Sequence, residues 1–543
     1  MRKYMLTLLV VSVGVATTSY SVSNVSFRMM GLGPGLVGIV DDEYSDIYFN
    51  PAYVTRVEGS KLYTNLSNLQ KWGYDRFMAP DTANFPYFNL VGFITGIPEK
   101  KGGLILESSG LALSGSYEKA VDNRDELGRY VDSTKYELSG GFGSKSAVFI
   151  GGMKLGEYDV GFLFNPNWFG ARLKTVLEAK AHRYIVGDTL FEYTKEMGST
   201  EFKFQTRWFA FSVGGVTGGP ENEWSFCGGV TPARLSLATY NLYDYFTIPF
   251  WPGGAHPDSA SFQMALKADA ELDLGGTSIN LNFRNKRRGE TSSLSLLGRL
   301  EYVTLPVEAS YYDSVYALVK SSPDITTKAE NIRSQFASGS GNFFNICFGV
   351  GSERYFDMGG LRHISAVGAR LSIVLGGASF DIEPLQEREY YFYDEPDTLY
   401  DVEYTRTYTS GETIETKGSG LGMILSIPAG LETYLNKKFV LRLGAYSIIP
   451  LYMKGKWEAK LIDTGWKEVY DYTRGGTDTT IVEPPDELDS RTDIVEFAAQ
   501  LVNVTAYYFG AGYRVNDAIE LNFLHFANLT DLGTWRISVN IRY

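Results

Sequence analysis

The chain ends with Trp535–Tyr543, WRISVNIRY, in which apolar and polar side chains alternate strictly. One face of this stretch is apolar or aromatic: Trp535, Ile537, Val539, Ile541 and Tyr543. The other face is polar: Arg536, Ser538, Asn540 and Arg542. Successive side chains of a β-strand point to opposite faces, so a period of two predicts a strand. One apolar and one polar face is the pattern of strands in a membrane barrel.

The same alternation recurs in many other stretches of the chain. Ser278–Arg284 and Phe439–Ala445 both alternate, and Asn516-Asp517 marks a hairpin turn before the last strands. The chain is rich in Gly (58), Tyr (37) and Phe (33). These features predict an all-β fold, a transmembrane antiparallel β-barrel of about 14 strands, within a range of 14–18. A soluble solenoid or sandwich array is the alternative, since a half-buried sheet shows the same alternation.

The final strand resembles the assembly signal of outer-membrane barrels, because it is amphipathic and ends on an aromatic residue. The resemblance implies that the barrel assembly machinery recognises the apolar face of Trp535–Tyr543. It also implies contact with outer-membrane lipid, and a location in the outer membrane of a diderm bacterium.

The N-terminus has the three parts of a signal peptide. Arg2 and Lys3 supply the positive charge, Met5–Ala16 is a short apolar run, and small polar residues lead to Ser21. The apolar run is too short to span a bilayer comfortably, and no later stretch reaches 18 uninterrupted apolar residues. We therefore expect residues 1–21 to be a signal peptide.

A short helical element is predicted between the leader and the first strand. The stretch 41–56 reads DDEYSDIYFNPAYVTR. Asn is a preferred N-cap and Pro suits the first helical position, so Asn50 and Pro51 mark a helix start, followed by Ala52. One or two turns need tertiary packing to persist. We therefore expect residues 22–60 to form a plug in which Asn50, Pro51 and Ala52 act in gating, and residues 61–543 to form the barrel.

The same region resembles two families. Acidic and small residues, then aromatics, then Asn-Pro-Ala and a strand at Lys61–Leu69 resemble the N-terminus of FadL-type long-chain fatty-acid transporters and of PorV-type barrels that serve type IX secretion. Tyr53 departs from the Gly that often follows in these families. The first resemblance favours 14 strands and implies passive transport of hydrophobic small molecules such as long-chain fatty acids.

Two other functions remain open. A PorV-type barrel would be a non-transporting adaptor that binds a secreted protein through its outer loops. A general porin is favoured if the arginines Arg284, Arg442, Arg536 and Arg542 all face the lumen. Lateral release of an apolar cargo would need an interruption in the wall, for which Gly102-Gly103 and Gly376-Gly377 are the candidates.

Long insertions are expected on the outer side of the barrel. The acidic stretches Glu387–Lys417 and Lys456–Asp493 are predicted to form outer loops. Within Pro306–Gly341, Asp324 is predicted to cap a helix that carries Ala329 on its apolar face. The residues of that face and two nearby tyrosines would line an outer apolar groove: Tyr312, Tyr316, Ile332 and Phe336. The alternative is a loop helix that packs on the rim.

Little in the sequence indicates catalysis, a cofactor or a metal. The formal net charge is −13, which disfavours nucleic-acid binding. Cys227 and Cys347 have neither disulfide-framework nor metal-site spacing, and the four His are scattered without an HExxH motif. No Ser has the Gly spacing of a nucleophile elbow. We expect a protein that is not an enzyme.

Overall fold

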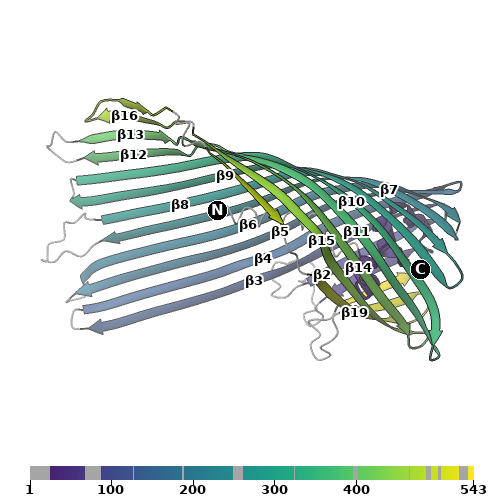
Figure 1. Cartoon of the computed structure of the whole chain (residues 1–543). Helices are drawn as coiled ribbons and strands as arrows, with labels where there is room; N and C mark the ends of the chain where they lie inside the picture. The colour runs from purple at the N-terminus through teal and green to yellow at the C-terminus, as the bar shows by residue number, and fades with distance from the viewer. Residues whose placement is uncertain are drawn as a thin grey trace.

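The computed structural model describes residues 25–67, 87–125, 128–185, 189–219, 221–248, 261–322, 325–394, 401–463, 465–484, 491–498, 503–524 and 536–543. It is a closed antiparallel β-barrel of 16 strands that holds short helical turns inside one end (Figure 1). The predicted leader, residues 1–21, lies outside the described residues. In the ranges above, no helix is long and apolar enough to span a bilayer.

Most of the wall consists of long strands, whose bounds are β3 (Lys100–Asp125), β4 (Gly128–Leu155), β5 (Tyr158–Ile185), β6 (Thr189–Gly219), β7 (Asn222–Ile248), β8 (Ser261–Arg288), β9 (Ser292–Ser322), β10 (Ile325–Met358), β11 (Leu361–Ile382), β14 (Glu412–Tyr434) and β15 (Phe439–Asp463). Shorter strands are β1 (Lys61–Ser67), β2 (Tyr87–Ile97), β12 (Gln386–Asp394), β13 (Val402–Thr409), β16 (Lys467–Arg474), β17 (Thr479–Val482), β18 (Arg491–Ala498), β19 (Val504–Arg514), β20 (Ile519–Leu524) and β21 (Arg536–Arg542).

The first and last strands close the barrel. β1 pairs with β2 on one side and with β21 on the other. The wall therefore runs from β1 through β11 to β14, β15, β19, β20 and β21, whereas β12, β13, β16 and β17 extend the sheet beyond it. The favoured count of 14 was too low, although 16 falls within the predicted range. Alternation marks a strand but does not tell whether it is a wall strand or an extension.

The plug occupies the end where the chain makes short turns, which we call the plug end (Figure 1). It comprises α2 (Phe27–Leu32), η2 (Pro34–Leu36), α3 (Glu43–Phe49) and η3 (Pro51–Arg56). Its buried side chains, among them Phe27, Ile47 and Val54, pack with inward-facing wall residues in one apolar cluster. At this end the β10–β11 turn is Gly359-Gly360, both with positive φ, as a tight hairpin turn requires.

Contacts with the plug identify the inner face of each strand. A Cβ added to Gly161 of β5, Gly214 of β6 or Gly351 of β10 would collide with plug atoms, so these residues face inward. The pairing register from β3 to β10 shifts only near Arg183 and Ile325, at the far ends of the strands. Alternate residues therefore keep the same face along most of each strand.

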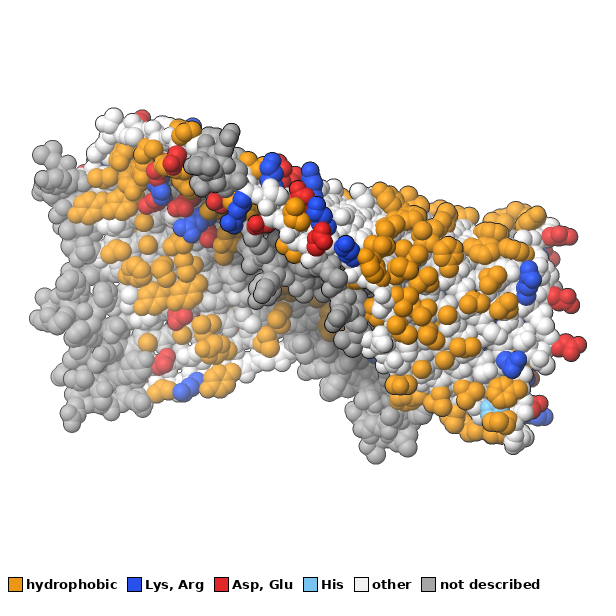
Figure 2. Space-filling view, in the orientation of Figure 1, with side chains coloured by type: hydrophobic (Ala, Val, Ile, Leu, Met, Phe, Trp, Pro, Cys, Tyr) orange, Lys and Arg blue, Asp and Glu red, His pale blue; other side chains and the backbone are white. Residues whose placement is uncertain are grey.

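Around the plug, the outer face of the barrel is apolar. The outward residues of this band include large exposed hydrophobics: Phe149, Phe162, Phe164, Phe211, Val213, Phe226, Ile279, Leu281, Leu296 and Phe348. Figure 2 shows hydrophobic side chains crowding the outside of the plug end, with charged ones at its rim. We call this surface the apolar band.

The pattern of the two faces is reversed in the outer half of the barrel, the part farther from the plug. The outward face there carries ion pairs such as Lys135–Glu137, Arg172–Glu201 and Arg234–Asp273. The inward face carries apolar side chains instead, for example Leu177 and Leu266. Strands β3 to β11 are 22–34 residues long, whereas about 9–11 residues are enough for a strand to cross a bilayer. The strands therefore continue well beyond one membrane thickness.

Two predictions about Pro306–Gly341 were wrong. The segment belongs to the β9–β10 hairpin, so Ala329 and Ile332 lie on opposite faces instead of on one helical face. The four residues of the predicted groove lie on the outward face of the outer half: Tyr312, Tyr316, Ile332 and Phe336. Apolar residues three and four apart suggested a helix, but the strand pairing between β9 and β10 overrides that local pattern.

The long acidic insertions are also largely strands. Glu387–Lys417 contains most of β12, all of β13 and the start of β14, and Lys456–Asp493 contains β16 and β17. Gly102-Gly103 and Gly376-Gly377, the candidates for a wall interruption, are themselves paired with both neighbouring strands. In the final strand, Ile537, Val539 and Ile541 face outward as predicted, while Trp535 lies outside the described residues.

Candidate functional site

Asn50 anchors the plug to the barrel wall. Its side-chain oxygen accepts a hydrogen bond from the Ala52 backbone N–H at 3.0 Å, which caps the η3 helix beginning at Pro51. Its Nδ2 donates to the carbonyl oxygens of Gly215 (3.1 Å) and Phe226 (3.0 Å) in the wall. The predicted cap is therefore present, although the helix is 3-10. The gating role of these residues stays a prediction.

We expect Asn50→Ala to loosen the plug without unfolding the barrel. The variant loses the cap, worth about 0.5–2 kcal/mol, and two hydrogen bonds of about 1 kcal/mol each. Gly214→Ala should act in the same direction, because its Cβ would lie 1.9 Å from Asn50 Oδ1. Faster protease cleavage of the plug in folded barrels is the expected readout. Cleavage at the wild-type rate in both variants would show that this anchor does not hold the plug.

A set of charged residues fastens the plug to strands next to this anchor. The Arg284 guanidinium is 1% exposed and binds Asp46 of the plug and Glu223 of the wall, both at 2.9 Å. It also lies over the Tyr53 ring, 4.6 Å from the ring centroid. Glu223 in turn accepts hydrogen bonds from Tyr53 and Arg56. One buried arginine thus joins two plug elements to strands β7 and β8.

Lys286 repeats this arrangement two residues farther along β8. Its ammonium group is fully buried and donates to the Ile39 carbonyl oxygen at 2.8 Å. It also pairs with Asp41 at 2.8 Å and Glu353 at 3.3 Å, and Arg288 pairs with Asp41 at 3.1 Å. We use the name charge latch for Asp41, Asp46, Glu223, Arg284, Lys286 and Arg288.

Burial and nearby charge act on the two plug carboxylates with different results. Burial raises the pKa of Asp46 to about 6, although the positive charge of Arg284 acts against this rise. Burial would also raise the pKa of Asp41, but the charges of Lys286 and Arg288 outweigh it and hold that pKa well below its usual range. Asp41 is therefore ionised at neutral pH, as its ion pairs require.

The arginines do not form an open charged channel. Arg284 faces inward, but it is occupied by the plug. Arg442 also faces inward and binds Glu432 at 2.8 Å, and Glu432 receives Arg28 of the plug at 2.8 Å. Sequence reasoning made a porin conditional on these arginines facing the lumen, and it could not show their partners, most of which are distant in the sequence. Their occupation by the plug weighs against the porin hypothesis.

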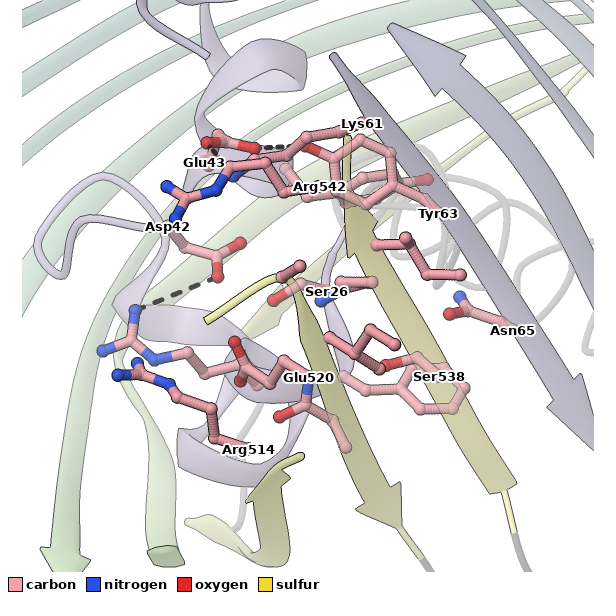
Figure 3. A pocket seen from close by; sticks show the side chains of 18 of the residues that line it. Ser26, Asp42, Glu43, Lys61, Tyr63, Asn65, Arg514, Glu520, Ser538 and Arg542 are labelled. Carbon is pink, nitrogen blue, oxygen red and sulfur yellow. Dashed lines mark hydrogen bonds and ion pairs between the residues drawn. The ribbon is translucent and has the colours of Figure 1, made fainter. Parts of the chain in front are cut away.

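A polar hollow separates the plug from the seam formed by β19, β20, β21 and β1 (Figure 3). Its volume is about 430 Å³. Figure 3 shows side chains of both signs around it, including Glu43, Lys61, Arg514, Glu520 and Arg542. Glu43 there accepts hydrogen bonds from Lys61 and Tyr63. The plug therefore also contacts the seam, through the hydrogen bonds of Glu43 with β1 and through the close packing of Gly31 against Gly510 of β19.

The outer half holds a larger hollow of about 1100 Å³, between strands β3 and β9. We call it the apolar trough. Its inward-facing lining includes Tyr117, Tyr136, Leu138, Leu177, Tyr243, Leu266 and Val315. In Figure 1 the strands of this half spread as a single curved layer. The predicted groove residues lie on the other face of the same sheet.

Polar side chains line the wall between the trough and the plug. Asn165 and Asn167 of β5 face inward and are 6% and 4% exposed. Glu301 of β9 is also buried, and Ser278 donates a hydrogen bond to it at 3.0 Å. A molecule that moved from the trough to the plug would therefore pass from an apolar to a polar surface. Within the described ranges, no group of His, Cys, Asp or Glu side chains could hold a metal ion.

Comparison with known proteins gives fold-level likeness. The sequence matches no protein-family model and no curated protein. A FadL homologue from Pseudomonas aeruginosa is 13% identical and covers 66% of this chain and 90% of its own, with a TM-score of 0.24. The copper transporter OprC is 8% identical and covers 89% and 80%, with a TM-score of 0.20. The evidence for function therefore lies in the geometry of the plug and the trough.

Proposed function

We propose that this protein is an outer-membrane barrel that takes up hydrophobic or amphipathic small molecules by passive transport. The observation that carries the proposal is the reversal of faces along the strands. The apolar band surrounds the plug end, where it would meet lipid, and the outer half turns polar side chains outward toward water. An apolar inner surface held up in water has the chemistry to capture molecules that water excludes.

The trough fits this class of cargo in size and chemistry. Small-molecule sites commonly have volumes of about 300–1,000 Å³ and mostly apolar walls with a few polar groups. The trough, at about 1100 Å³, is slightly larger than that range, and the polar side chains Asn165 and Asn167 lie between it and the plug. A long-chain amphiphile, such as a fatty acid, could place its tail in the trough and its head group at Asn165 and Asn167.

The charge latch supports transport that depends on plug movement. Ions and sugars would pass freely if the lumen were open, but buried ion pairs fix the plug across it. The polar hollow at the seam leaves space of about 430 Å³ beside the plug. We expect the plug to yield there first, so that the latch side serves as the pivot.

We expect Leu177→Lys and Leu266→Lys to weaken binding of a fluorescent long-chain fatty acid about tenfold or more. A buried Leu side chain contributes about 1.5–3 kcal/mol, and 1.4 kcal/mol corresponds to tenfold in affinity. Ser236→Lys is the matched control, because it adds the same charge to the outward face of β7. Titration of the probe into purified barrels measures the effect. Equal affinities for all of these variants would place the binding site elsewhere.

A secretion adaptor is the second candidate, favoured by the outer sheet extension. Tyr391, Tyr404, Tyr470 and Tyr472 form a chain of ring contacts there, with centroids 5.5–6.2 Å apart across β12, β13 and β16. Tyrosine-rich surfaces are common in protein interfaces. Co-purification of a secreted protein that is lost in Tyr404→Ser, with no flux of fatty acid in liposomes, would favour the adaptor over the transporter.

A further inference from the structure

A row of basic side chains lies at the level where the apolar band ends on strands β4 to β7. In the pairing register, Lys145 is opposite Trp168, Trp168 is opposite Arg207, and Arg207 is opposite Arg234. All four residues occupy outward positions, since their neighbours along each strand face inward. We call Lys145, Trp168, Arg207 and Arg234 the basic row.

The row has more positive charge than its protein neighbours neutralise. Arg234 pairs with Asp273 at 3.0 Å, but in the described part of the chain neither Lys145 nor Arg207 has an ion pair. Arg207 and Arg234 stand directly opposite each other, an arrangement that is unfavourable for like charges. This occurs on a chain whose net charge is −13. An external anion would relieve the repulsion.

The excess continues two or three outward positions farther from the plug. Arg172, Lys174 and Lys203 are the next basic residues on the outward face of β5 and β6, and Glu201 alone serves both Arg172 and Lys203. The corresponding outward positions on β10 are uncharged: Asn342, Ser340, Ser338 and Phe336. On β10 the positive surface is therefore interrupted.

Aromatic side chains locate the row relative to a bilayer. Trp168 contacts Phe209 edge to face, with ring centroids 6.3 Å apart, and both are exposed on the outward face. Aromatic residues favour the membrane–water interface, where one edge is apolar and the other is wet. Because short turns mark the periplasmic end of such barrels, the plug end is periplasmic and the basic row lies at the outer leaflet.

We propose that the basic row binds the phosphate groups of an anionic glycolipid in the outer leaflet. Lys145 and Arg207 would contact the phosphates, with Trp168 between them against the upper acyl chains. Arginine and lysine are the side chains that recognise phosphate, through charge-assisted hydrogen bonds. The proposal rests on the membrane placement in the proposed function but is independent of any transported cargo.

The test compares lipid retention by four proteins: wild type, Lys145→Gln/Arg207→Gln, Lys145→Arg/Arg207→Lys and Lys135→Gln/Lys180→Gln. The last is the matched control, since Lys135 and Lys180 lie farther out on β4 and β5 and pair with Glu137 and Glu178. Each barrel is reconstituted in phosphatidylcholine nanodiscs with or without diphosphoryl lipid A, and bound lipid A is measured by native mass spectrometry after extraction into detergent.

We expect wild type, the charge-conserving variant and the control to retain lipid A. The Lys145→Gln/Arg207→Gln variant should bind lipid A at least about tenfold more weakly, because it loses two basic side chains that attract the anionic lipid. Heat-modifiable mobility on gels confirms that each barrel is folded. Equal retention by the Gln variant, loss in the control, or no retention by wild type would overturn the proposal. Fatty-acid flux in lipid A-free liposomes tests the transport function separately.

Discussion

Arg284→Met is expected to free the plug and raise the ion conductance of the barrel by a large factor. The substitution removes the one cation that contacts both Asp46 and Glu223 at 2.9 Å, and it leaves two carboxylates without this partner in a buried site. Breaking a buried ion pair in this way costs about 3–5 kcal/mol. Such a change raises the fraction of barrels with a displaced plug by roughly a hundred- to several-thousandfold.

Single-channel recording in planar bilayers measures this effect directly. Arg354→Met is the matched control, because Arg354 is exposed on the outward face at the same end of the barrel. A conductance equal to wild type in Arg284→Met would show that the charge latch does not hold the plug closed.

A compensating variant separates the loss of charge pairing from the loss of packing. In Arg284→Met/Asp46→Asn, the plug carboxylate becomes a neutral amide of similar shape, while Glu223 keeps Arg56 and Arg288 as partners. We expect closed-state conductance close to wild type, since replacing both sides of a buried ion pair is often neutral. If the double variant leaks as much as Arg284→Met, the stacking of Arg284 on Tyr53 matters more than its charge.

The strands and the cap could be predicted from sequence because both depend on local patterns. The alternation in β21 required only neighbouring residues, and Asn50 precedes a Pro that can start a helix. The strand count could not be read in this way. Long strands such as β10 carry the same period of two within and beyond the apolar band. Only the pairing of strands distinguishes a wall position from an extension.

The functional features that the sequence did not reveal depend on distant contacts. The alternation of apolar and polar residues is the same whether the apolar face points inward or outward. The reversal of faces that forms the trough is therefore visible in the sequence only as a change in which alternate positions along a strand are apolar. The charge latch joins residues far apart, such as Asp46 and Arg284. The helix predicted in Pro306–Gly341 is a different kind of error, in which a local pattern misled. Ile332 and Phe336 matched a helical spacing by chance, although both lie in a strand.

The charge latch and the seam lie on different sides of the plug, and the two sides are built differently. Strands β7, β8 and β10 hold the plug through buried charges, whereas the seam beside the polar hollow is built from the shortest wall strands. The barrel thus depends on β21 to stay closed beside the polar hollow. Damage to β21 should therefore affect assembly more than damage to a long strand.

Val539→Arg is expected to block assembly of the barrel, while Asn540→Arg should be tolerated. Val539 lies on the outward face of β21, opposite Thr64 of β1 and Leu521 of β20. Arg on the lipid face of a barrel costs about 2–4 kcal/mol near the middle of the bilayer. β21 has only 7 residues to form both of its ladders, so little pairing energy is available to offset that cost.

Asn540 makes the matched control because it is the next residue on the same strand and points to the other face. It lines the polar hollow, where an added guanidinium remains among polar side chains such as Glu43 and Glu520. Folding into lipid vesicles, followed by heat-modifiable mobility, measures the folded fraction of each variant. Ile541→Asp, nearer the end of the strand, should give an intermediate loss, since the cost falls toward the interface. Normal assembly of Val539→Arg would mean that this face of the seam does not contact lipid, whereas equal loss in both Arg variants would mean that β21 tolerates no added bulk on either face.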